Sequence, residues 1–148
     1  MNSQEILDTL NRLLEAELAA LEYYRIHAEA IPEKEIADGV RGILPAEESH
    51  AITLAGRIRE LGGAPIEPGG AASARGREMG EKSKAKGTLE MLRVEMEQEQ
   101  QAIKDYSIPV ADIVDDMVTL EMLEEHLFDE MRHAKWLKQQ VLEMEGNR

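Results

Sequence analysis

The segment ELAALEYY at residues 17–24 returns in outline as EQQAIKDY at residues 99–106. Both segments read Glu-x-x-Ala-apolar-x-x-Tyr, so Glu17 and Tyr24 correspond to Glu99 and Tyr106. A shared pattern at this distance along the chain is typical of an internal repeat. We therefore predict two related helical hairpins with two-fold pseudosymmetry.

Each segment is followed by a glutamate and a histidine three residues apart. The two tetrads are Glu47-Glu48-Ser49-His50 and Glu130-Met131-Arg132-His133. They begin thirty and thirty-one residues after Glu17 and Glu99. On a helix, positions i and i+3 share a face, so each tetrad directs one carboxylate and one imidazole the same way. One such tetrad is weak support in so acidic a chain, but two at matching intervals predict a site built from both halves.

The glutamates of this pattern lie on apolar helix faces. Glu17 and Glu99 share the stripe of Leu21 and Ile103, and an unpaired anion in a core costs several kcal/mol. Four inward carboxylates need about four positive charges, which two divalent cations supply. Mixed carboxylate and imidazole ligation suits iron, manganese or zinc better than calcium.

The hydrophobic periodicity predicts four long helices, over about 3–30, 32–61, 89–107 and 119–145. Pro45 and Pro109 fall within or near the end of two of them, so we expect a kink or a break at each. The prediction is an all-α four-helix bundle, with residues 1–148 as a single domain.

The two predicted hairpins are joined by residues 62–88, which are rich in glycine, alanine, proline and serine. Five cations lie in this segment: Arg75, Arg77, Lys82, Lys84 and Lys86. Such a composition is typical of a solvated, mobile segment, so we expect a flexible crossover. A docking surface for an acidic partner is the alternative.

Composition limits the classes of partner. The formal net charge of -13 argues against nucleic acid and against anionic membranes, because phosphate binding needs clustered Lys and Arg. The chain has no cysteine, which excludes disulfides and thiolate metal sites. It also lacks a signal-peptide pattern and a long apolar run, so we expect a soluble cytoplasmic protein.

The order Glu, Glu-x-x-His, Glu, Glu-x-x-His resembles that of the ferritin-like di-iron carboxylate proteins, most closely bacterioferritin and more distantly rubrerythrin. Further agreement lies in Tyr24-x-x-His27-Ala28, Glu90-Met91-Leu92-Arg93, Val110-Ala111-Asp112 and His133-x-x-Trp136-Leu137. The resemblance covers about residues 7–61 and 89–142. It implies a ferritin-like domain with a long crossover between its second and third bundle helices.

The resemblance also implies the roles of six metal ligands. Glu47 and Glu130 would bridge two iron ions, Glu17 and His50 would complete one site, and Glu99 and His133 the other. The implied activity is oxidation of ferrous iron by oxygen or hydrogen peroxide. Two alternatives stay open: a protein that binds or sequesters metal without turnover, and a di-metal oxygenase of the same superfamily.

Other residues near the ligands receive roles from the same resemblance. Asp129 would accept the ring N–H of the opposite histidine, whereas Ala46 holds the matching position before His50, so the two metal positions would differ in affinity. Tyr24 and Tyr106 would hydrogen-bond ligand carboxylates or donate an electron, although two ordinary core tyrosines explain them about as well. His27 and His126 are not expected to be ligands, because neither has a carboxylate three residues before it.

Two departures from bacterioferritin change the expectation for cofactor and assembly. Glu48 stands where that family has its haem methionine, so we expect no haem. The chain continues for about 15 residues after His133, too few for the short fifth helix of the storage shell. We therefore expect a homodimer or another small homo-oligomer.

One ligand is ambiguous in the sequence. The family spacing counted back from Glu130 selects Glu97, whereas the internal repeat selects Glu99. An α-helix advances about 100° per residue, so these two side chains point about 160° apart and cannot both face the core. We favour Glu99, because Ala102 and Tyr106 follow it as Ala20 and Tyr24 follow Glu17.

Overall fold

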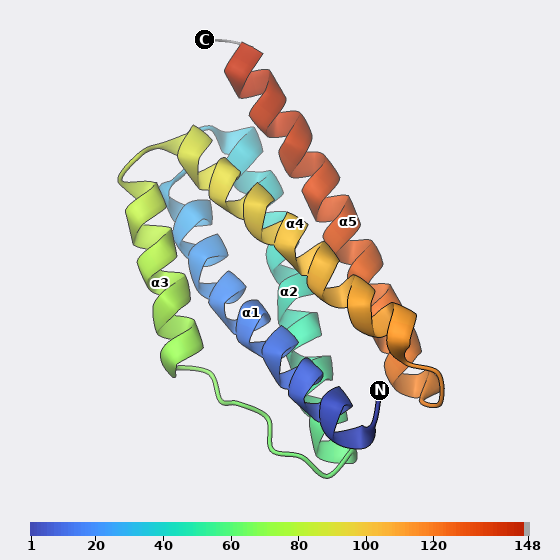
Figure 1. Cartoon of the computed structure of the whole chain (residues 1–148). Helices are drawn as coiled ribbons and strands as arrows, with labels where there is room; N and C mark the ends of the chain where they lie inside the picture. The colour runs from blue at the N-terminus through green and yellow to red at the C-terminus, as the bar shows by residue number, and fades with distance from the viewer. Residues whose placement is uncertain (147–148) are drawn as a thin grey trace.

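The computed structural model describes residues 1–146, and these form five helices without a strand. The helices are α1 (Ser3–Ala30), α2 (Lys34–Glu60), α3 (Ala71–Lys84), α4 (Thr88–Asp112) and α5 (Met117–Gly146). Four long helices run side by side, and α3 lies along the outer side of α1 (Figure 1). The predicted all-α bundle is confirmed.

The amphipathic pattern of the long helices places two apolar clusters along the bundle. Within α1, buried residues from Ile6 to Leu18 belong to one cluster, and those from Ala20 onward belong to the other. The other three long helices divide in the same way. The helical spacing of apolar residues thus leaves a band in the middle of the bundle, where the two clusters meet.

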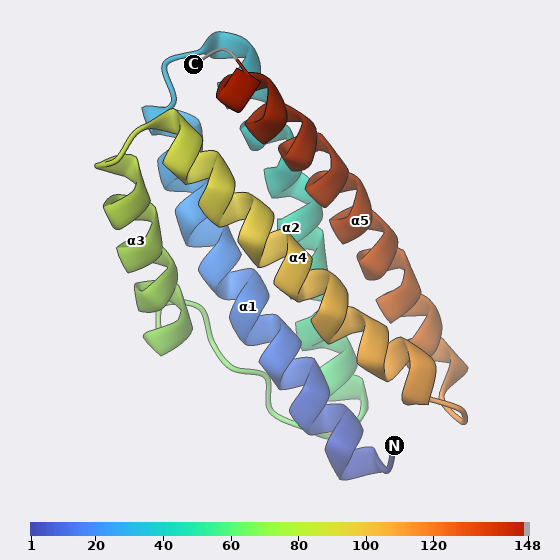
Figure 2. The same ribbon diagram turned by 45° about the horizontal axis from the view of Figure 1, so that its top comes forward.

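The crossover prediction is wrong in one respect, because part of residues 62–88 is helical and packed. α3 lies beside α1 in both views (Figure 2). A Cβ atom on Gly76 would lie 2.1 Å from the carbonyl oxygen of Ala19, and one on Gly80 would lie 2.8 Å from Ile26 Cδ1. The glycines that suggest a linker therefore allow two helices to approach closely.

Neither proline breaks its helix, so the break that was one of the two expected outcomes does not occur within residues 1–146. α2 continues through Pro45, which lies on its exposed side, where water can satisfy the carbonyl that loses its helical donor. α4 continues past Pro109 to Asp112, and Pro109 accepts a hydrogen bond from the N–H of Ile113. Across residues 1–146, no helix combines the length and apolar character that crossing a membrane requires.

Candidate metal centre

Six predicted ligand side chains come together in the middle band of the bundle. α1 supplies Glu17, α2 supplies Glu47 and His50, α4 supplies Glu99, and α5 supplies Glu130 and His133. They form two groups, Glu17, Glu47, His50 and Glu130, and Glu47, Glu99, Glu130 and His133. In each group the four possible donor atoms lie within 4.8 Å of one another.

The two groups share Glu47 and Glu130. Oε1 of Glu47 lies 3.8 Å from His50 Nδ1 and 3.2 Å from His133 Nδ1. Oε1 of Glu130 lies 3.5 Å and 3.4 Å from the same two nitrogens. Glu17 Oε2 approaches only His50, at 3.4 Å, and Glu99 Oε1 approaches only His133, at 3.5 Å. Glu47 and Glu130 thus lie between the two imidazoles, whereas Glu17 and Glu99 each lie beside one of them.

The donor atoms are buried and lack partners. Among residues 1–146, seven buried side-chain atoms have no hydrogen-bond partner: Glu17 Oε2, Glu47 Oε1, His50 Nδ1, Glu95 Oε1, Glu99 Oε2, Glu130 Oε1 and His133 Nδ1. Six of them belong to the six predicted ligands. Buried polar atoms are normally satisfied, so this concentration of lone pairs fits a site for cations.

The ionisation of the cluster supports the same interpretation. Burial, and then the charge of Glu47, raises the pKa of Glu17 and of Glu130 well above its usual value. Burial opposes ionisation of Glu47 as well, but the nearby imidazole of His133 and the adjacent carboxyls of Glu130 and Glu17 lower its pKa to about 2. Burial also disfavours charge on His133, yet the carboxylates of Glu130 and Glu47 raise its pKa to about 12. Without cations, the cluster must therefore retain protons.

Both predicted tyrosines contact ligand carboxylates of the opposite hairpin. The Tyr24 hydroxyl donates to Glu99 Oε1 at 2.6 Å, and the Tyr106 hydroxyl donates to Glu17 Oε1 at 3.2 Å. Both rings are buried. The two contacts follow the internal repeat, and each joins α1 to α4.

The two histidines of the cluster differ in their surroundings. His50 Nε2 lies 2.8 Å from Asp129 Oδ2, as the sequence suggests, and Asp129 also accepts a hydrogen bond from Arg132. The side chain of His50 is 2% exposed and that of His133 is 13% exposed. The two halves of the site are therefore chemically unequal.

The ambiguous glutamate of α4 is resolved by burial. Glu99 is 2% exposed and lies in the cluster, whereas Glu97 is exposed. The position that the internal repeat favours is thus the inward one. That Glu99 binds metal stays a prediction.

Sequence reasoning missed a buried pair one helical turn from Glu99. Glu95 Oε2 lies 2.5 Å from His27 Nδ1, and Ser83 of α3 lies 2.7 Å from His27 Nε2. Burial lowers the pKa of His27 to about 4, whereas burial and the nearby Glu99 raise that of Glu95. The spacing of Glu95 four residues before Glu99 could have indicated that both face inward.

The sequence also predicts no ligand role for His126, although it lies four residues before Glu130 on the same face. Its ring stacks on that of His50, with centroids 4.0 Å apart. Its Nδ1 lies 3.2 Å from the Tyr106 hydroxyl, and its Nε2 lies 2.9 Å from Thr53 Oγ1. Burial lowers its pKa to about 3, so it is a neutral imidazole.

A narrow pocket of about 50 Å³ between α1 and α4 reaches the cluster. Its outer lining includes Ala16 and Gln101, which are exposed, and its inner lining includes Glu47 and Glu130. A cavity needs about 10–15 Å³ of accessible volume to hold one water molecule, so a pocket of this size suits a small molecule such as oxygen or peroxide.

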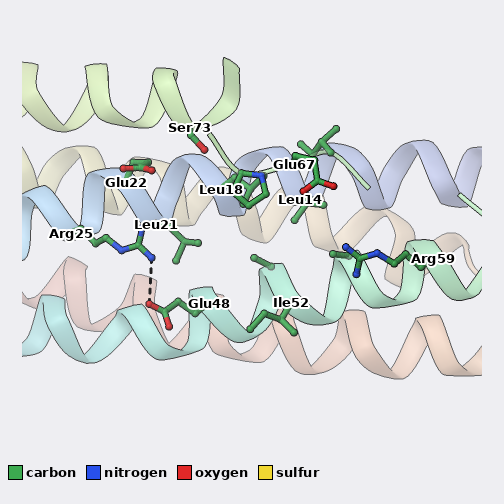
Figure 3. Close-up of a pocket in the computed structure, with 14 residues that line it drawn as sticks. Leu14, Leu18, Leu21, Glu22, Arg25, Glu48, Ile52, Arg59, Glu67 and Ser73 are labelled. Carbon is green, nitrogen blue, oxygen red and sulfur yellow. Dashed lines mark ion pairs between the residues drawn. The ribbon is translucent and has the colours of Figure 1, made fainter. Parts of the chain in front are cut away.

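Glu48 faces away from the cluster. It lines a larger surface pocket of about 460 Å³ and forms an ion pair with Arg25 of α1 at 3.6 Å (Figure 3). Leu18, Leu21 and Ile52 supply apolar lining (Figure 3). The side chain of Glu48 is therefore engaged at the surface and not in the cluster, and the absence of haem stays a prediction.

Residues 7–146 match the model of the ferritin-like domain family. A search of curated proteins finds no match.

Three solved structures share the fold. A dodecameric thioferritin, the bacterioferritin-related protein of Bacteroides fragilis, has a TM-score of 0.81 at 20% identity, over 97% of this chain and 88% of its own. A ferritin-like diiron-carboxylate protein of Bacillus anthracis str. Ames has a TM-score of 0.75 at 22% identity, over 95% and 99%. Bacterioferritin of Rhodobacter capsulatus has a TM-score of 0.75 at 24% identity, over 95% and 86%.

Proposed function

Because the chain belongs to the ferritin-like domain family, we propose that it binds two iron ions in the buried cluster and oxidises ferrous iron with hydrogen peroxide or oxygen. The observation that carries the proposal is the pair of donor groups that share Glu47 and Glu130. Shared carboxylates hold two cations close together, as two-metal sites require. The donor set also suits manganese or zinc, so the choice of iron rests on the family.

Each residue of the cluster has a distinct part in this proposal. Glu47 and Glu130 would bridge the ions, and the remaining four ligands would complete one site or the other. Two bound ferrous ions supply the two electrons that reduce hydrogen peroxide to water with uptake of two protons. Tyr24 and Tyr106 hold the terminal carboxylates in place through the hydrogen bonds described above. The narrow pocket favours a small oxidant over an organic substrate.

Anaerobic titration with ferrous iron, followed by oxygen or hydrogen peroxide, tests the proposal. We expect about two ferrous ions per chain, then a rapid rise of near-ultraviolet charge-transfer absorbance. Stoichiometric binding with no absorbance change would favour the alternative, a protein that sequesters metal without turnover. Elemental analysis of protein purified without added metal identifies the native ion.

We also propose that the chain assembles with identical copies. The Bacteroides fragilis neighbour is dodecameric, which does not match the homodimer that the sequence suggests beside another small homo-oligomer. Light scattering on the purified protein distinguishes a dimer from a dodecamer. A monomer would overturn the proposal of a homo-oligomer.

A further inference from the structure

A chain of hydrogen bonds leads from the ligand cluster to the surface of the bundle. The Tyr106 hydroxyl lies 3.2 Å from Glu17 Oε1 and 3.2 Å from His126 Nδ1. On the far side of the imidazole, Nε2 lies 2.9 Å from Thr53 Oγ1. Glu17, Tyr106 and His126 are buried, whereas Thr53 is exposed. Three hydrogen bonds thus connect a ligand carboxylate with water.

Two arrangements of hydrogen atoms fit these positions. In the first, protonated Glu17 donates to Tyr106, and Tyr106 donates to His126 Nδ1. His126 Nε2–H then donates to Thr53, whose own hydrogen points to the carbonyl of Ser49 at 2.9 Å. In the second, Thr53 donates to His126 Nε2, Nδ1–H donates to Tyr106, and Tyr106 donates to ionised Glu17. Both satisfy every donor and acceptor of the chain.

The second arrangement has one proton fewer than the first. To pass between them, the Thr53 hydroxyl first turns from the Ser49 carbonyl toward solvent. Each group then hands its hydrogen outward to the next, and the original hydroxyl hydrogen of Thr53 leaves to water. The imidazole changes tautomer, and Glu17 is left ionised and ready to bind a cation. The reverse sequence returns a proton from water to the cluster. No nitrogen or oxygen atom needs to change its place.

The other half of the pseudosymmetric site lacks this chain. Tyr24 donates to Glu99 as Tyr106 donates to Glu17. The position that matches His126, four residues before Glu47, is the buried apolar Ile43. The hydrogen-bonded chain therefore occurs only in the half of the site that contains Glu17, and the internal repeat does not account for it.

A buried cluster of carboxylates must exchange protons with water whenever cations bind or leave, because its charges cannot stand unbalanced in the core. We propose that this hydrogen-bonded chain is the proton path between the metal centre and solvent, with His126 as its central relay. The inference rests on the proposed metal centre. It assigns His126 a role in the rate of proton exchange and none in metal ligation.

Stopped-flow mixing of metal-free protein with Co²⁺ tests the path. Cobalt absorbance reports metal binding, and a pH-indicator dye in weak buffer reports proton release in the same experiment. We expect His126→Phe, which fills the space without a relay, to slow proton release by roughly tenfold or more while total Co²⁺ and total protons stay unchanged. Glu125→Gln, an exposed change on the same helix, is the matched control.

Rescue separates a relay from a structural role. In His126→Ala, added imidazole should restore the rate, whereas the same imidazole should leave the wild type and His126→Phe unchanged. An unaltered rate in His126→Phe, or His126→Ala that imidazole does not accelerate, would overturn the proposal. If Asp129→Asn slowed proton release and His126→Phe did not, the proton path would instead run through His50. Failure of the wild-type protein to bind Co²⁺ would refute the metal centre itself.

Discussion

His50 Nε2 lies 2.8 Å from Asp129 Oδ2, so the carboxylate fixes the imidazole with Nδ1 facing the cluster. The matching position in the first hairpin is Ala46, which cannot support His133 in this way. We predict that Asp129→Ala weakens one of two stepwise Co²⁺ affinities by roughly 10–100-fold and spares the other. Calorimetric titration measures both steps, and equal weakening of both would contradict this assignment.

Glu130 and Glu17 should differ when each is replaced by alanine. Glu130 lies near both imidazoles, so its loss removes a ligand of both ions. Glu17 belongs to one donor group only. We predict that Glu130→Ala retains at most one weakly bound ion per chain, whereas Glu17→Ala retains one tightly bound ion. Metal content after gel filtration distinguishes the two variants, and identical losses would argue against bridging by Glu130.

The two candidate glutamates of α4 provide a matched pair. Glu99→Ala should abolish rapid ferrous oxidation, because it removes a terminal ligand from the second donor group. Glu97→Ala should leave the rate nearly unchanged, because Glu97 is exposed. Stopped-flow absorbance after mixing with ferrous iron in air ranks the variants. The reverse ranking would refute the alignment based on the internal repeat.

The stability of the metal-free protein should fall as the pH rises from 7 to 9. The pKa values of Glu17, Glu95, Glu99 and Glu130 are raised by burial, and neighbouring carboxylates raise that of His133 to about 12. In this window, folded His133 keeps a proton that it loses on unfolding, because its ordinary pKa is 6.5; the buried carboxyls act in the same direction wherever their raised pKa values lie above the pH. Each such proton lowers the free energy of unfolding by about 1.4 kcal/mol per pH unit.

Denaturant unfolding with a chelator present measures this slope. Burial lowers the pKa of His27 and of His126 below 6.5. These two histidines therefore change the free energy of unfolding with pH only below pH 7. Zn²⁺ should reduce or reverse the slope, because cations replace the retained protons. Metal-free stability that does not change between pH 7 and 9 would count against a cluster that stores protons.

Gly76 tests the packing of α3. A Cβ atom there would lie 2.1 Å from the carbonyl oxygen of Ala19, so Gly76→Ala must displace the helix. We predict a loss of about 1–3 kcal/mol in the free energy of unfolding. Gly56→Ala is the control, since nothing lies within 4 Å of its added methyl group, and it should stabilise α2 by up to about 1 kcal/mol. Thermal unfolding that shows no difference between the two would mean that α3 is not docked.

Helical spacing carried most of the information that the sequence holds about this molecule. The repeat around Glu17 and Glu99 predicted which side of α4 faces inward, because the same apolar offsets recur in both helices. The tetrads at Glu47 and Glu130 predicted which histidines share their face. These are local relationships within one helix, and helix geometry fixes them before any packing occurs.

Contacts between residues of different helices could not be predicted from the sequence in the same way. Glu95 and His27 are 68 residues apart, and their pairing depends on how α4 crosses α1. The composition of α3 suggested a mobile linker, because glycine and serine are usual in linkers. In the folded chain Gly76 allows close approach of two helices, and Ser83 contacts a buried histidine. The composition of a segment alone cannot distinguish a flexible linker from a helix that packs closely against another helix.

The inequality of the two hairpins also bears on how such a molecule can evolve. Glu95, His126 and Asp129 all belong to the second hairpin, and the matching residues of the first are Leu13, Ile43 and Ala46. A symmetric pair of first hairpins would leave its histidines without carboxylate support. A symmetric pair of second hairpins would bury twice as many ionisable groups. Because the two hairpins belong to one chain, they can carry different residues at matching positions. Two identical subunits could not, so each of them would have to supply every residue that the site needs.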